Sequence, residues 1–144
     1  MNGKSSLHVM RETMNGQRYA DVLRQYVPEI SNALGNPGTD WFFMEDNATP
    51  HTCQVANAAK QELGLRRINW PSKSPDLNPI EHVWSWMKRN LRRQLKPEDT
   101  LQLLEEKVSR VWDEVPVQII NQLVSSMTAR VAATIQNKGG STHY

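Results

Sequence analysis

Cysteine is almost absent from this chain, and so are long apolar runs. Cys53 is the only cysteine among the 144 residues, so no disulfide can form within the chain, and we expect a reducing compartment. No apolar stretch reaches the roughly 18 residues that a membrane-spanning helix needs. The first residues, Met-Asn-Gly-Lys-Ser-Ser, have no apolar core behind them and do not resemble a signal peptide. Internal repeats and low-complexity segments are also missing. From the lack of long apolar runs we expect no membrane partner.

A strong excess of charge of one sign is missing as well. The net charge is +2 and the sequence pI is about 8.8, and such a mildly basic balance does not by itself imply a nucleic-acid partner. Apolar residues make up 38% and charged residues 22% of the chain, which is ordinary for a globular protein. The length favours a single domain.

The hydrophobic pattern predicts strands joined by helices. Short apolar or β-rich runs predict strands at 7–11, 41–45 and 67–70, and helical spacing predicts helices over 16–34 and 53–63. Three further helices follow, the first opening at Asn78-Pro79, an N-cap residue followed by a proline. Strands alternating with helices indicate an α/β fold with parallel neighbours, followed by a C-terminal helical group.

Two carboxylates stand out in this pattern. Asp46 follows the predicted 41–45 strand, Glu81 lies in the first turn of the helix after Pro79, and 34 residues separate them. Hard cations such as Mg²⁺ and Mn²⁺ prefer such oxygen ligands, and two of them about 4 Å apart catalyse phosphoryl transfer. Each residue also has a simpler explanation. Asp46 can organise a turn, and Glu81 occupies the capping-box position relative to Asn78.

Two segments resemble a known family. Phe43-Met-Glu-Asp-Asn-Ala-Thr-Pro-His51 and Ser74-Pro-Asp-Leu-Asn-Pro-Ile-Glu-His-Val-Trp84 resemble motifs in the DDE catalytic domain of mariner-superfamily transposases, in the Tc-type branch. In that branch the second Asp and the final Glu have the same spacing. The resemblance extends over nearly the whole chain and corresponds to the C-terminal part of the domain.

This resemblance implies an RNase H-like fold and metal-dependent cutting and joining of DNA, as in transposition and DNA integration. It implies Asp46 and Glu81 as catalytic carboxylates and ligands of Mg²⁺ or Mn²⁺. It also implies Asn47 and His51 as residues that shape the site. The implied partners are transposon ends and target DNA, and the implied location is the nucleus.

One expected carboxylate has no counterpart. In the family the first catalytic Asp lies on the first strand, ahead of the segment with which this chain begins. None of the acidic residues before Asp46 matches it, and Glu45 should point to the opposite face of its strand from Asp46. The acidic residues concerned are Glu12, Asp21, Glu29, Asp40 and Glu45.

The resemblance therefore predicts a partial RNase H-like fold that lacks the family's first strands. Residues 1–95 are its RNase H-like part and residues 96–144 its C-terminal helices. With one carboxylate missing, we expect weakened metal binding and no activity from the chain alone. We also expect self-association, because an unpaired strand edge invites it.

A basic cluster follows Glu81 on the same predicted helix. It contains Lys88, Arg89, Arg92 and Arg93. These residues are compatible with contacts to DNA phosphates or with a nuclear localisation signal, and equally with a solvated helix face. Two hypotheses for function remain open: a transposase catalytic fragment, or a domesticated, non-catalytic module for DNA binding or oligomerisation.

Overall fold

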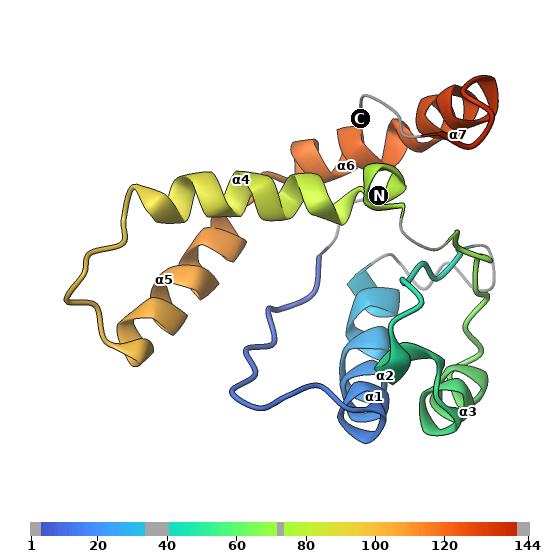
Figure 1. The fold of residues 1–144 in the computed structure, drawn as a ribbon. Helices are drawn as coiled ribbons and strands as arrows, with labels where there is room; N and C mark the ends of the chain where they lie inside the picture. The colour runs from blue at the N-terminus through green and yellow to red at the C-terminus, as the bar shows by residue number, and fades with distance from the viewer. Residues whose placement is uncertain (1–3, 34–40, 72–73, 141–144) are drawn as a thin grey trace. The chain divides into compact units, whose positions relative to one another are not determined.

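The computed structural model describes residues 4–33, 41–71 and 74–140. The chain divides into two compact units, Met1–Lys73 and Ser74–Tyr144, which are treated separately below. Figure 1 shows the elements in chain order: α1 (Gly16–Ala33), α2 (Thr49–Thr52), α3 (Gln54–Glu62), the 3-10 turn η1 (Pro75–Leu77), α4 (Ile80–Arg92), α5 (Leu101–Glu114), α6 (Val117–Ser125) and α7 (Met127–Gln136). None of the helices in the described ranges is long and apolar enough to cross a membrane.

The expected α/β fold with three strands is wrong for this chain. Within residues 4–33, 41–71 and 74–140 there are helices but no strand. Two of the segments predicted as strands meet at one isolated parallel bridge, Phe43 with Arg67. There the Phe43 N–H donates to the Arg66 carbonyl at 2.7 Å, and the Ile68 N–H donates to the Phe43 carbonyl at 3.0 Å.

The physical reason is that a strand needs a ladder of backbone partners, and strand propensity cannot supply one. The bridge between the 41–45 and 67–70 segments ends after two hydrogen bonds. The N-terminal segment is held by side chains of α1 instead. The backbone N–H of Ser6 donates to the Glu29 carboxylate at 2.8 Å, and His8 Nδ1 lies 3.0 Å from the Tyr26 hydroxyl.

In the first unit, α1 packs against α2 and α3 (Figure 1). Asn15 caps α1, because its side-chain oxygen accepts a hydrogen bond from the Arg18 N–H at 2.9 Å. The core consists of the apolar face of α1 and one alanine of α3, with partly buried apolar residues around them. Its buried members are Tyr19, Leu23, Val27 and Ala56. Gly16 allows close packing here, since a Cβ at that position would lie 2.1 Å from Cys53 Sγ.

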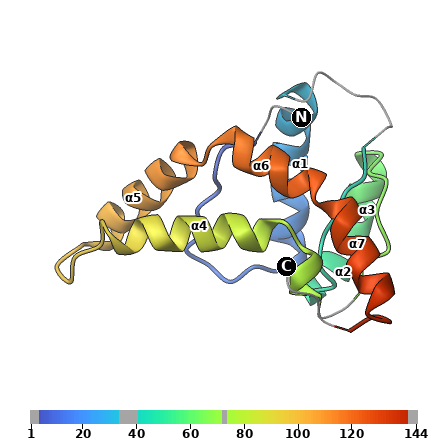
Figure 2. The ribbon, with the colours of Figure 1, turned by 90° about the horizontal axis from the view of Figure 1, so that it is seen from above.

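The second unit is helical throughout its described part. The helices α5 and α6 both pack on α4, and α7 contacts η1. Figure 2 shows α4 and α5 joined by the 93–100 connection, with α6 leading directly into α7. The helix α5 begins at Thr100, whose hydroxyl accepts a hydrogen bond from the Leu103 N–H. The Trp84 and Trp112 rings pack 5.9 Å apart between α4 and α5.

Most of the predicted helices are present, with changes at their ends. The helix expected at 16–34 is α1, and Pro28 lies inside it without ending it. The helix expected at 53–63 is α3, preceded by the separate turn α2. The last predicted helix is interrupted at Ser126, which separates α6 from α7. The predicted division into residues 1–95 and 96–144 stays a prediction.

Candidate active site

Asp46 lies on the surface of the first unit, directly after the Phe43 bridge. Its side chain is 62% exposed. Only one of its carboxylate oxygens, Oδ1, accepts hydrogen bonds among the described residues: one from His51 Nδ1 at 2.6 Å and one from the Ala48 N–H at 3.0 Å. The bond to Ala48 is the side-chain turn that the sequence offered as the simpler explanation. The carboxylate is therefore held through Oδ1, and Oδ2 is not engaged.

His51 and Asn47 hold the loop around this carboxylate. A carboxylate oxygen only accepts, so the His51 ring donates from Nδ1. The Asn47 side-chain amide donates to the Trp70 carbonyl at 2.9 Å, which ties the loop to the end of the 67–70 segment. These contacts position the two residues beside Asp46, and their predicted role in shaping the site stays a prediction.

Glu81 lies in the second unit, exposed in the first turn of α4. The cap of this helix is formed by Asn78, whose side-chain oxygen accepts from the Ile80 N–H at 3.2 Å. The reciprocal half of a capping box is not formed, because the Asn78 N–H donates to the Pro75 carbonyl at 3.0 Å. The Glu81 side chain is thus not committed to capping.

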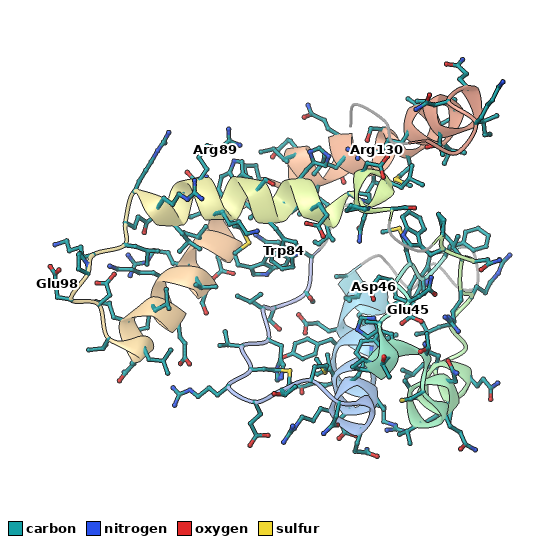
Figure 3. The ribbon with its side chains drawn as sticks, in the orientation of Figure 1. Glu45, Asp46, Trp84, Arg89, Glu98 and Arg130 are labelled. Atoms are coloured by element: carbon teal, nitrogen blue, oxygen red, sulfur yellow. The ribbon has the colours of Figure 1, made fainter. Side chains whose placement is uncertain are left out.

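The turn that leads to Glu81 is held by Arg130 of α7. The Arg130 side chain is buried, with only 2% of the residue exposed. Its Nη1 donates to the Asp76 carbonyl of η1 at 2.6 Å, and its Nε donates to the Ser126 hydroxyl at 2.9 Å. Figure 3 shows Arg130 at the end of the second unit where η1 lies. The C-terminal helix thereby fixes the Ser74–Pro79 motif.

The basic cluster lies on the outer side of α4. All four residues are exposed, whereas Val83 and Met87 of the same helix are buried. Figure 3 shows Arg89 on the opposite side of α4 from Trp84. Within the part of the chain that the structure describes, none of the four cations forms an ion pair with a carboxylate.

The structure also contains a buried charge cluster that the sequence analysis missed. Glu45 and Lys60 are buried beneath Asp46 and form an ion pair. A signal for Lys60 was present, since it follows Ala56, a buried residue of α3, by four positions and so lies on the same face of the helix. For Glu45, the expected alternation with Asp46 is present: the first is buried and the second exposed.

A complete metal site is not formed by the described residues. No group of three or more His, Cys, Asp or Glu side chains that could hold a metal ion occurs in them. The carboxylates of Asp46 and Glu81 are oxygen donors of the kind that hard cations prefer. They belong to different units, and their role as metal ligands stays a prediction.

Comparison with known proteins identifies the class. A model of the DDE superfamily endonuclease domain matches residues 1–103, so the chain belongs to this superfamily. The Tcb1 transposase of Caenorhabditis briggsae is 35% identical over 136 residues, covering 92% of this chain and 47% of that protein. The Tc3 transposase of Caenorhabditis elegans is 32% identical over 145 residues, covering 98% of this chain and 42% of that protein.

These relatives confirm the predicted resemblance to Tc-type transposases. The chain spans about half the length of the curated relatives it matches. A crystal structure of the catalytic domain of the Mos1 mariner transposase has a TM-score of 0.76 at 18% identity, covering 92% of this chain and 66% of that one. A structure of the Mos1 catalytic domain with raltegravir and Mg has a TM-score of 0.74 and also 18% identity, covering 92% of this chain and 67% of that one. These likenesses show a shared fold.

Proposed function

We propose that this chain is part of the catalytic domain of a Tc1/mariner-type transposase, a domain that cuts and joins DNA in a metal-dependent reaction. The observation that carries the proposal is the Asp46 carboxylate: it is exposed, it is oriented by His51 and Ala48, and its Oδ2 accepts no hydrogen bond from the residues that the structure describes. Asp46 lies within the Phe43–His51 motif that resembles the catalytic domain of Tc-type transposases.

In this proposal Asp46 and Glu81 are the carboxylate ligands of Mg²⁺ or Mn²⁺. The metal would neutralise charge on the attacking and leaving oxygens of the phosphodiester. Asp46 presents Oδ2 while His51 retains Oδ1, and Glu81 projects from the first turn of α4. Asn47 keeps the Asp46 loop against residue 70.

DNA is the proposed partner, and the outer side of α4 is its proposed binding surface. Exposed cations suit contact with phosphates. Among the described residues, no carboxylate forms an ion pair with Lys88, Arg89, Arg92 or Arg93. The proposal also includes self-association of the chain and a nuclear location.

We further propose that these 144 residues alone neither cut nor join DNA. Two carboxylates cannot fix two hard cations in the geometry that in-line attack requires. A chain that binds DNA without cutting it would then match the alternative, a domesticated DNA-binding module.

The test measures Mn²⁺ binding by electron paramagnetic resonance and metal-dependent nicking of supercoiled DNA. We expect weak Mn²⁺ binding that Asp46→Asn and Glu81→Gln each reduce, and no nicking. Glu98→Gln is the matched control, because Glu98 is an exposed carboxylate on the 93–100 connection of the second unit. Binding that Asp46→Asn leaves unchanged would reject Asp46 as a ligand. Nicking that both site variants abolish would refute the proposed inactivity.

A further inference from the structure

A hydrogen-bonded charge cluster lies beneath the Asp46 loop. The Glu45 side chain is 5% exposed and that of Lys60 is 2% exposed. Glu45 Oε1 accepts from Lys60 Nζ at 2.5 Å and lies 3.0 Å from Arg67 Nη2. Glu45 Oε2 accepts from the Tyr19 hydroxyl at 2.6 Å. Both oxygens of the buried carboxylate therefore have donors.

Stability alone is a poor explanation for this cluster. Removing two charges from water costs several kcal/mol for each, and a buried ion pair recovers that cost only with good geometry and additional hydrogen bonds. Apolar side chains of similar volume would pack between α1 and α3 at no such cost. We therefore explain the cluster by the local conformation that it favours and not by a gain in the free energy of unfolding.

The conformation that it selects is that of His51. A second hydrogen bond from Lys60 Nζ reaches the His51 backbone carbonyl at 2.6 Å. The Tyr19 ring lies 4.1 Å from the His51 ring, centroid to centroid, at a tilt of 35°. The cluster thus contacts His51 at its backbone and at its ring.

Tyr19 is suited to the role of a permanent donor. Burial, followed by the hydrogen bond to Glu45, raises the pKa of its hydroxyl far above the usual value. The hydroxyl therefore stays protonated and continues to donate to Glu45, while its ring supports the imidazole. The chain of contacts runs from Glu45 through Lys60 and Tyr19 to His51, and from His51 Nδ1 to Asp46 Oδ1.

We propose that Lys60, Glu45 and Tyr19 are positioning residues that hold His51 in the orientation and tautomer that fix the Asp46 carboxylate. The metal-binding part of this inference rests on the proposed function, in which Asp46 is a ligand. The orientation of His51 itself does not. Replacing a residue that is hydrogen-bonded directly to a metal ligand typically changes metal affinity about 10- to 100-fold. Lys60, Glu45 and Tyr19 act one contact further away, through His51, so we expect an effect at the lower end of this range.

The second unit offers a matched control for Lys60. Lys107 Nζ donates to the Asp99 carboxylate at 2.6 Å and to the Gln94 carbonyl at 2.8 Å, and its side chain is 12% exposed. It is thus another largely buried lysine that joins a carboxylate to a backbone carbonyl, and it belongs to the other unit. Replacing either lysine by Met removes the same kind of interaction.

The experiment compares Lys60→Met with Lys107→Met in the full 144-residue chain. Long-range ¹H–¹⁵N NMR at one mildly alkaline pH reports which His51 nitrogen carries the proton. We expect His51 to be protonated at Nδ1 in the unaltered chain and in Lys107→Met, and to become a mixture of tautomers in Lys60→Met. We also expect Mn²⁺ affinity to fall about tenfold in Lys60→Met alone.

Each outcome decides the inference. An unchanged His51 spectrum in a folded Lys60→Met protein would overturn it, and so would an equal change in Lys107→Met.

Should Lys60→Met fail to fold, as judged by circular dichroism, Glu45→Gln is the deciding variant, because it keeps the side-chain volume and removes the charge that anchors Lys60. Loss of the Nδ1 proton there supports the inference, and an unchanged spectrum overturns it. If Asp46→Asn leaves Mn²⁺ binding unchanged, the proposed function fails, while the His51 spectrum still decides the positioning role.

Discussion

Replacing Arg130 by Met should loosen the turn that precedes Glu81. Arg130 is almost fully buried and donates from Nη1 to the Asp76 carbonyl and from Nε to the Ser126 hydroxyl. Methionine fills similar space but cannot donate either bond. The contact joins α7 to η1 across 54 residues of sequence, so its loss should weaken the second unit as well as the turn.

The size of the effect follows from two opposing contributions. A hydrogen bond from a charged group contributes about 1.5 to 3 kcal/mol, and at least the two bonds to Asp76 and Ser126 are lost. Removing a buried charge recovers part of its desolvation cost. We therefore expect the free energy of unfolding of the second unit to fall by about 2 kcal/mol. For a unit of this size that lowers the Tm by about 10 °C.

The assay is amide hydrogen exchange at Leu77 and Asn78, whose N–H groups donate within the turn to the Ser74 and Pro75 carbonyls. A loss of about 2 kcal/mol should speed their exchange roughly 30-fold. Arg110→Met is the control, because Arg110 is an exposed arginine of α5 in the same unit. Equal exchange rates in the two variants would refute a clamping role for Arg130.

Two other expectations concern charge. Each neutralised phosphate contributes a slope of about −0.9 to the dependence of log affinity on log salt concentration. Arg89→Gln should therefore reduce the steepness of this slope for duplex DNA by about one, and Arg110→Gln should leave it unchanged. Equal slopes in the two variants would reject α4 as the DNA-binding surface. The pKa of the Asp99 carboxyl is lowered by the hydrogen bond from Lys107 and, to a smaller extent, by that from the Lys96 N–H. The ionised carboxylate therefore stabilises the folded chain above the unfolded pKa of about 3.9, and this contribution is lost as the pH falls through the lower folded pKa. Urea unfolding of the unaltered chain and Asp99→Asn should therefore show a stability difference that shrinks below about pH 4; a constant difference would contradict the assignment.

Several features could be predicted from neighbouring residues alone. The spacing of Tyr19, Leu23 and Val27 predicts α1, and the structure has it. The motif around Glu81 indicates the superfamily without any coordinates. Such features are local, because helical hydrogen bonds and caps join residues at most a few positions apart.

Other features depended on contacts between distant segments, and there the sequence analysis was wrong or silent. The 41–45 and 67–70 segments have the composition of strands, yet they share one bridge, because a ladder requires partners that propensity cannot specify. No prediction was made for Lys60, and in the structure it is buried beside the carboxylate of Glu45.

The sequence by itself determined that Asp46 and Glu81 are carboxylates in a transposase-like context and that helices surround them. Only the tertiary structure decided how they are held: Asp46 by a histidine that rests on a buried ion pair, and the turn before Glu81 by Arg130 of α7. The reason is that side-chain chemistry and helical periodicity are written into short stretches of chain. The burial of a charge, and the partner that makes it tolerable, exist only once distant segments have packed together.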